Sequence, residues 1–212
     1  MGYQWWLKVS SIIIYLIRHG KTLANERKLY CGKTDLPLSD IGIKEIEKLK
    51  SKIDYPNCEK YFTSGAKRAN ETFNILYENE KYIELKGFFE YDFGDFEMKS
   101  YEDLKENKDY INWIMDNEGI VSCPNGESKN TYKKRIKEEF ESFISTIKKE
   151  NLKDVLVVSH GGTIGTILEE FYDNSKNFYS WQPKCGEGYK IVVEILEDNF
   201  KIKEVKELKN RS

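Results

Sequence analysis

The sequence predicts an α/β protein, a three-layer α/β/α domain with a mostly parallel central sheet. Two uninterrupted apolar runs, residues 12–17 and 155–158, indicate strands buried on both faces, as in a parallel sheet. Strand patterns and helical patterns alternate along most of the chain, which is typical of a sheet covered by helices on both sides. We expect one such domain over residues 12–212, preceded by an N-terminal extension over residues 1–11.

The composition limits the partners of this chain. Its 212 residues include 34 Lys and Arg and 36 Asp and Glu, for a net charge of −2. A nearly neutral chain offers no broad basic surface, so we expect it to bind neither nucleic acid nor a membrane. The 4 cysteines are scattered with no CxxC pair, which favours a reduced, cytoplasmic protein. Residues 1–8 lack the features of a signal peptide, and no pattern indicates an oligomeric state.

The first third of the chain begins with the apolar strand, which ends at Arg18, His19 and Gly20. A polar stretch over residues 21–37 follows, and a connection of that length is usually functional or disordered. Ser39 is then placed to cap a helix that runs to about residue 53.

The middle of the chain pairs short strands with one helix. Residues 61–63 form an apolar strand pattern, and the segment after it repeats apolar residues at the spacing of one helical face. Arg68 lies in the first turn of that helix, near the carboxyl end of the strand. After a minor strand at 83–85, the aromatic and acidic segment 87–100 is expected to be irregular and to cross toward the site.

The C-terminal half continues the alternation of helices and strands. Gly126-Glu127-Ser128 precedes the clearest helical stripe in the chain, and it is either a helix start or part of the site. The expected elements are helices at residues 101–116, 127–149 and 163–171, the second buried strand at 155–158, and a closing antiparallel hairpin at 189–196 and 200–205.

The only two histidines of the chain occupy the same kind of position. His19 and His160 each follow a buried strand and precede a glycine. Ligands of open α/β sheets bind outside the carboxyl ends of the strands, so the two histidines are expected to share one site with Arg18 and Arg68. Guanidinium groups suit phosphate oxygens, and a neutral imidazole can form a covalent intermediate. These residues predict phosphoryl transfer through a phosphohistidine.

The motifs around these residues resemble those of the histidine phosphatase superfamily, the phosphoglycerate-mutase-like proteins. Arg18-His19-Gly20-Lys21-Thr22 with Asn25 matches the RHGxTxxN signature, and His160-Gly161-Gly162 matches a late HGG motif. Within the superfamily, the chain is most similar to the α-ribazole-5′-phosphate phosphatases of cobalamin synthesis. The similarity covers most of residues 12–193, with further matches at 30–32, 35–38, 68–69, 71–72, 90–97 and 124–128.

The resemblance implies a phosphomonoesterase that needs no metal and no cofactor and acts on a small-molecule phosphomonoester. His19 would be the phosphorylated nucleophile. The residues that would bind the phosphoryl group are Arg18, Asn25, Arg68, His160 and Gly161.

The proton donor is the role for which the residues themselves leave a choice. The resemblance implies Glu90, which would protonate the leaving oxygen and then deprotonate the attacking water. Sequence chemistry alone does not choose among Glu90, Asp92, Asp95 and Glu97, which all lie in one acidic and aromatic segment.

The leaving group is expected to meet aromatic side chains. Tyr91, Phe93, Phe96, Phe178 and Trp181 offer flat apolar area that suits a benzimidazole nucleoside, although Phe93 and Phe96 fit a core position equally well. The substrate-binding residues that the resemblance implies are Thr22, Cys31, Gly32, Tyr91 and Trp181. We therefore expect hydrolysis of α-ribazole-5′-phosphate to α-ribazole.

Three other functions remain open from the sequence. They are a broad-specificity histidine phosphatase, a phosphoglycerate mutase and a pseudo-phosphatase that only binds. Mutases of the family carry longer insertions after the acidic segment and a longer C-terminal tail, and this chain is compact in both places. The complete set of catalytic residue types disfavours the pseudo-phosphatase.

Overall fold

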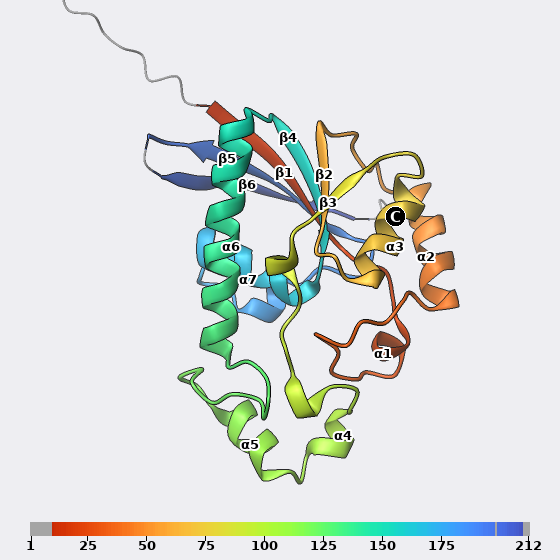
Figure 1. The fold of residues 1–212 in the computed structure, drawn as a ribbon, viewed down its shortest axis with the longest axis vertical. Coiled ribbons are helices and arrows are strands. Elements are labelled where there is room, and N and C mark those ends of the chain that lie inside the picture. The colour runs from red at the N-terminus through yellow and green to blue at the C-terminus, as the bar shows by residue number, and fades with distance from the viewer. Residues whose placement is uncertain (1–9, 198, 210–212) are drawn as a thin grey trace, which may run out of the picture.

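A six-stranded sheet forms the centre of the molecule (Figure 1). The computed structural model describes residues 10–197 and 199–209. The strands are β1 (Ser10–Arg18), β2 (Lys60–Thr63), β3 (Tyr82–Glu84), β4 (Asp154–Ser159), β5 (Gly188–Ile195) and β6 (Phe200–Leu208). Their order is β3-β2-β4-β1-β5-β6, in which β1 to β4 run parallel and β5 is antiparallel to both of its neighbours. The expected mostly parallel sheet is confirmed.

Helices cover both faces of the sheet (Figure 1). On one side lie α2 (Asp40–Lys50) and α3 (Lys67–Leu76), and on the other lie α6 (Lys129–Glu150) and α7 (Gly161–Phe171). Successive side chains of a strand point to opposite faces. Ile14 and Leu16 of β1 accordingly pack in the core with α6 and α7, and Ile17 packs in the core with α2 and α3. This is the three-layer arrangement that the apolar strands predicted.

Two segments differ from the expected elements because polar side chains cap short helices. The stretch expected as a polar loop contains α1 (Leu23–Glu26), since Thr22 and Asn25 form a capping box at its start. The helical pattern over 101–116 is broken into α4 (Tyr101–Leu104) and α5 (Lys108–Met115). The cause of that break is Asn107, whose Oδ1 accepts the backbone N–H groups of Asp109 and Tyr110 and begins a new helix.

The remaining connections agree with the expected pattern. Ser39 caps α2 and Ser128 caps α6, so Gly126-Glu127-Ser128 is a helix start. The segment 87–100 is irregular, as predicted. Short 3₁₀ helices lie at Lys86–Phe88, Gly94–Phe96 and Phe178–Trp181.

The described part of the chain begins with the first strand. β1 begins at Ser10, and Ser10 and Ser11 pair with Ile195 and Glu194 of β5, so the end of the expected extension over 1–11 belongs to the sheet. The aromatic residues 1–8 and the hairpin position Asp198 lie outside the described residues. Within residues 10–197 and 199–209, no helix combines the length and apolar character needed to cross a membrane.

Candidate active site

The two histidines meet at the carboxyl end of the sheet. His19 follows β1 and His160 follows β4, and these strands are parallel neighbours with Arg18 paired to Ser159. The two imidazole rings are 5.2 Å apart between centroids, at 65° to each other. Both side chains are buried, with 5% of His19 and 0% of His160 exposed. The structure thus brings together the two residues that the sequence placed at one site.

The imidazole of His19 is held in one tautomer. Its Nδ1 lies 2.6 Å from the carbonyl oxygen of Gly20, and a carbonyl accepts only, so Nδ1 carries the proton. The neighbouring backbone is fixed as well, since the N–H of Gly20 donates to Thr72 Oγ1 at 2.8 Å. Burial, with the charges of Arg68 and Arg18, lowers the pKa of His19 well below its ordinary value. His19 is therefore neutral at pH 7, with the lone pair on Nε2.

Arg68 orients the second histidine. It lies in the first turn of α3, is 1% exposed, and donates from Nε to Nδ1 of His160 at 3.3 Å. His160 Nδ1 is thus an acceptor, and its Nε2–H donates to Ser64 Oγ at 2.8 Å. The other guanidinium nitrogens donate to the carbonyls of Thr34 at 3.0 Å and Gly32 at 2.7 Å, which fastens this loop over the histidines. Burial and the Arg68 charge lower the pKa of His160 well below its ordinary value.

Arg18 is the arginine with unused hydrogen-bonding capacity. Its Nη1 donates to the carbonyl of Pro183 at 2.9 Å, but its buried Nε has no hydrogen-bond partner among the described residues. A buried N–H without an acceptor costs free energy. Because Arg18 also lines a cavity, an oxygen of a bound anion is a natural acceptor for this group.

The two glycines after His160 make room for charged side chains at the start of α7. A Cβ at Gly161 would lie 3.0 Å from Cζ of Arg18, and one at Gly162 would lie 2.2 Å from Oε1 of Glu90. The backbone N–H of Gly162 donates to Glu90 Oε2 at 2.8 Å. The HGG motif is therefore explained by two close approaches to a helix N-terminus, where anions are also favoured.

Among the four acids of the segment 90–97, Glu90 alone lines the cavity. Its carboxylate accepts three hydrogen bonds, from Gly162 N at 2.8 Å, from Tyr132 Oη at 2.8 Å and from Tyr91 N at 3.0 Å. These donors come from three separate segments and hold the carboxylate in one place beside the start of α7.

The other three acids have structural partners. Glu97 accepts backbone N–H groups from Gly32, Lys33, Thr34 and Phe93 at 3.0 to 3.3 Å, so it shapes the loop that Arg68 also binds. Asp92 pairs with the exposed Lys33 at 3.0 Å, and Asp95 accepts from Asn125 at 3.1 Å. The geometry therefore separates Glu90 from the acids that the sequence left equivalent.

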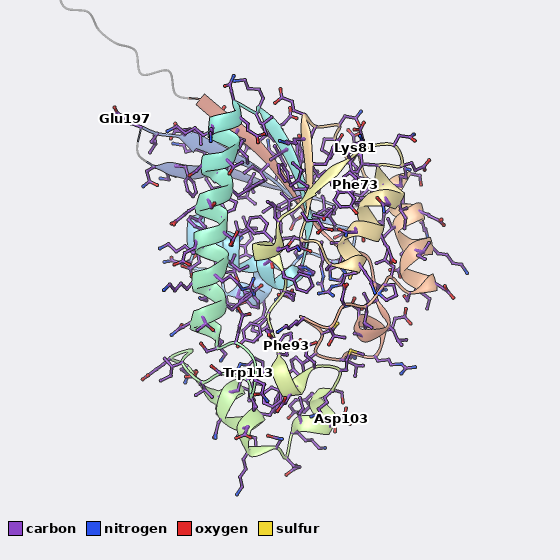
Figure 2. All side chains as sticks on the ribbon, viewed as in Figure 1. Phe73, Lys81, Phe93, Asp103, Trp113 and Glu197 are labelled. Carbon is purple, nitrogen blue, oxygen red and sulfur yellow. The ribbon has the colours of Figure 1, made fainter. Side chains whose placement is uncertain are left out.

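The cavity has a volume of about 500 Å³ and a largely aromatic wall. Figure 2 shows Phe93 and Trp113 lying close together below the sheet, and their ring centroids are 6.1 Å apart. Phe96 belongs to the core, with 1% exposed. The aromatic residues that line the cavity are Tyr30, Tyr91, Phe93, Trp113, Tyr132, Phe178 and Tyr179. The histidines and Arg68 are not among the lining residues.

The residues expected to bind the leaving group are only partly brought together. Cys31 and Tyr91 line the cavity. Thr22 instead caps α1 and is 1% exposed, and Gly32 uses its carbonyl for Arg68. Trp181 is also turned inward, because its indole N–H donates to the carbonyl of Asp173 at 3.2 Å and only 5% of the residue is exposed. Trp181 does not line the cavity in this structure, and its contact with the substrate stays a prediction.

Two further residues around Glu90 were not singled out from the sequence. Arg135 forms a two-point ion pair with Glu127 at 2.8 Å for each bond, and it donates to the carbonyls of Phe89 and Glu90. Tyr132 is almost fully buried and donates to Glu90. Both lie on α6, and in the sequence Tyr132 is part of the apolar stripe of that helix. The only related signal in the sequence is the motif residue Glu127, which is the partner of Arg135.

We expect the free energy of unfolding to decrease as the pH falls below about 6.5. His19 and His160 have lowered pKa values in the folded state, so below 6.5 the unfolded chain binds more protons than the folded one. Each histidine then removes up to about 1.4 kcal/mol per pH unit, until the pH reaches its folded pKa. Urea unfolding between pH 8 and pH 5 measures this slope.

A matched control is His160→Gln, which removes one titrating group. Between pH 6.5 and pH 5, its free energy of unfolding should decrease less steeply with falling pH than that of the wild type. Stability that stays constant over this range would contradict the neutral, buried histidines.

Comparison with known proteins places the chain in a family. The family model described as histidine phosphatase superfamily (branch 1) matches residues 14–207. A Salmonella typhimurium relative, named adenosylcobalamin/alpha-ribazole phosphatase, is 29% identical over 87% of this chain and 91% of its own length. A putative phosphoserine phosphatase 2 of Hydrogenobacter thermophilus is 27% identical over 73% of this chain and 76% of its own length.

Solved structures agree on the fold. A putative alpha-ribazole-5′-P phosphatase from Escherichia coli superposes with a TM-score of 0.75 at 22% identity, covering 92% of this chain and 96% of the other. Because the family model spans nearly the whole sheet, this chain belongs to branch 1 of the histidine phosphatase superfamily and is a phosphoric monoester hydrolase.

Proposed function

We propose that the protein hydrolyses a phosphomonoester through a phosphohistidine on His19, and that its substrate is α-ribazole-5′-phosphate. The observation that carries the mechanism is the short hydrogen bond from His19 Nδ1–H to the carbonyl of Gly20, at 2.6 Å. It directs the lone pair of a neutral imidazole to Nε2. In the first step Nε2 forms a bond to phosphorus while the bond from phosphorus to the ester oxygen breaks.

The charge of the transferred phosphoryl group is met by fixed cationic and dipolar groups. Arg18 offers a buried Nε–H without a hydrogen-bond partner among the described residues, and Arg68 donates from Nε to His160 and carries a charge that also acts on His19. Gly161 and Gly162 open α7, whose N-terminus favours negative charge. Such groups stabilise the developing charge without reorganising during the reaction.

Glu90 moves the protons in both steps of the proposed reaction. As a carboxylic acid it gives its proton to the ester oxygen as the alcohol leaves. As a carboxylate it then takes a proton from water, whose oxygen attacks phosphorus while the phosphorus–Nε2 bond of His19 breaks. The overall products are the alcohol and inorganic phosphate. The support for this role is the position of Glu90 in the cavity wall, next to the first turn of α7.

The choice of α-ribazole-5′-phosphate rests on the cavity wall and on one group of relatives. Tyr91 and Phe93 are 4.8 Å apart between ring centroids, and with Trp113 they form a continuous aromatic surface. Aromatic side chains offer broad apolar contact to a flat heterocycle such as benzimidazole. The Salmonella typhimurium relative named for this activity shares 29% identity with the chain.

We expect a higher kcat/KM for α-ribazole-5′-phosphate than for 3-phosphoglycerate, phosphoserine or simple sugar phosphates, and unchanged rates in excess EDTA. Arginines and a helix N-terminus neutralise the phosphoryl charge here, which is the task of a metal ion in other phosphatases. A substrate panel measured with and without EDTA tests both parts. Comparable rates on the small substrates would indicate a broad-specificity phosphatase. Activity restored only by one divalent ion would contradict neutralisation of the phosphoryl charge by arginines and a helix N-terminus.

A further inference from the structure

Thr166 is a second residue of the cavity wall, after Arg18, with a buried polar group that no described residue satisfies. Thr166 lines the cavity and is 1% exposed, and its Oγ1 is buried without a hydrogen-bond partner among the described residues. Helical threonines commonly donate to the carbonyl four residues earlier. Thr72 and Thr146 of this chain do so, to the carbonyls of Arg68 at 2.6 Å and Ser142 at 3.1 Å. Thr166 departs from that pattern at the one place where a ligand is expected.

The position of Thr166 relates it directly to the reacting end of the cavity. Gly162, Thr166 and Glu169 all line the cavity, and their spacing places them on one face of α7. Thr166 lies one helical turn beyond Gly162, which is about 6 Å along the helix axis. Gly162 donates its N–H to Glu90, so the unpartnered hydroxyl is about one turn from the carboxylate that serves the leaving oxygen.

The groups around Thr166 complete a polar strip between the reacting end and the aromatic wall. Glu169 is held by Lys133, with 2.7 Å between Nζ and Oε2, and its other oxygen accepts the N–H of Phe178 at 3.1 Å. Gln182 also lines the cavity. A leaving alcohol in this cavity therefore meets both polar side chains of α7 and aromatic rings.

We propose that Thr166 determines substrate specificity by hydrogen bonding a hydroxyl group of the leaving alcohol. The preferred substrates are then phosphomonoesters of polyhydroxylated alcohols that also carry an aromatic group. A nucleoside 5′-phosphate has this order of parts, because its ribose hydroxyls lie between the ester oxygen and the base. This inference rests on the proposed function and adds to it the residue that distinguishes a ribosyl ester from a plain aryl ester.

The test compares three substrates, α-ribazole-5′-phosphate, its 2′,3′-dideoxy analogue and p-nitrophenyl phosphate. For the wild type, removal of the ribose hydroxyls should lower kcat/KM about tenfold, the value of one net hydrogen bond. In Thr166→Val the two ribazole substrates should become equal within about twofold. The loss caused by Thr166→Val on α-ribazole-5′-phosphate should exceed its loss on p-nitrophenyl phosphate by about tenfold. Thr166→Ser, which keeps the hydroxyl, should restore the preference.

The melting temperature of Thr166→Val is a second measurement, in which the variant is expected to gain and not to lose. Thr166→Val replaces an unsatisfied buried hydroxyl by a methyl group of similar size, so its melting temperature should equal or exceed that of the wild type. Thr146→Val is the matched control, because that hydroxyl already donates within α6 and lies far along the chain from the cavity residues of α7. It should leave the substrate preference unchanged.

Three results would overturn the assignment of Thr166. The wild type would treat the ribose and dideoxy substrates alike, or Thr166→Val would lower all three rates equally, or it would lower the melting temperature because a structural water had satisfied the hydroxyl. Each of these leaves p-nitrophenyl phosphate hydrolysis by the wild type intact, so the proposed function stands. Absence of hydrolysis of both α-ribazole-5′-phosphate and p-nitrophenyl phosphate by the wild type would instead contradict the proposed function, and this inference with it.

Discussion

His19→Ala is expected to abolish phosphatase activity, with a loss on the order of 10⁴-fold or more in kcat, while the protein still folds. The variant lacks the imidazole whose Nε2 is the proposed nucleophile. The fold should survive because the side chain removed is polar and is bound to Gly20, with little part in the apolar core. Rates on α-ribazole-5′-phosphate and p-nitrophenyl phosphate measure the loss, and circular dichroism verifies the fold.

Trapping the intermediate makes this prediction specific. Wild-type enzyme quenched in acid during turnover should carry an acid-labile phosphate, which His19→Ala should lack. The chain has only 2 histidines, so a phosphohistidine that persists in the variant would have to lie on His160. His160→Ala is the matched control and should still form the intermediate, at a reduced rate. Full activity in His19→Ala would refute the covalent mechanism.

Glu90→Gln is expected to lower kcat by about 10² to 10⁴-fold, with a much smaller effect on the inhibition constant of inorganic phosphate. An amide of the same shape cannot donate the proton that the leaving oxygen needs, nor accept one from water. Arg18 and Arg68, the side chains proposed to bind the anion, make no hydrogen bond to Glu90, so the affinity for phosphate should change less than kcat. Steady-state kinetics with phosphate as the competing product separates the two effects.

The three neighbouring acids provide the controls for Glu90. Asp92→Asn and Asp95→Asn should change kcat little, since both groups have partners outside the cavity. Glu97→Gln requires a melting curve beside the kinetics, because it disturbs three backbone N–H groups of the loop that binds Arg68 and the N–H of Phe93. A larger loss of kcat in any of the three, at an unchanged melting temperature, would show that the acid is assigned to the wrong residue.

The choice of Glu90 among the four acids also illustrates what sequence reasoning left open. Four carboxylates lie within eight residues, and each is compatible with a site at this end of the sheet. Their distinction depends on contacts with Tyr132 and Gly162, which are 42 and 72 residues away from Glu90 in the chain. Local patterns carry no information about such contacts, so the structure was needed to separate Glu90 from Asp92, Asp95 and Glu97.

Burial gave two side chains surroundings that the sequence does not indicate. Trp181 looked suited to a flat substrate, but its large apolar surface and indole N–H are satisfied inside the protein. Thr166 looked like an ordinary helical threonine, and what marks it is that its hydroxyl has no partner in the described part of the chain. Both residues show that an aromatic or hydroxyl side chain acquires a role from its surroundings.

The sequence by itself determined the sheet and the ends of its central strands. Apolar runs without alternation indicate strands covered on both faces, and parallel neighbours must end at one edge, so His19 and His160 had to lie close together. The tertiary structure decided the tautomer of His19, the identity of the cavity acid and the lining of the cavity. The physical reason is that hydrophobic periodicity encodes which face of an element is buried. Hydrogen bonds and close approaches depend on side chains that meet only after distant segments have packed.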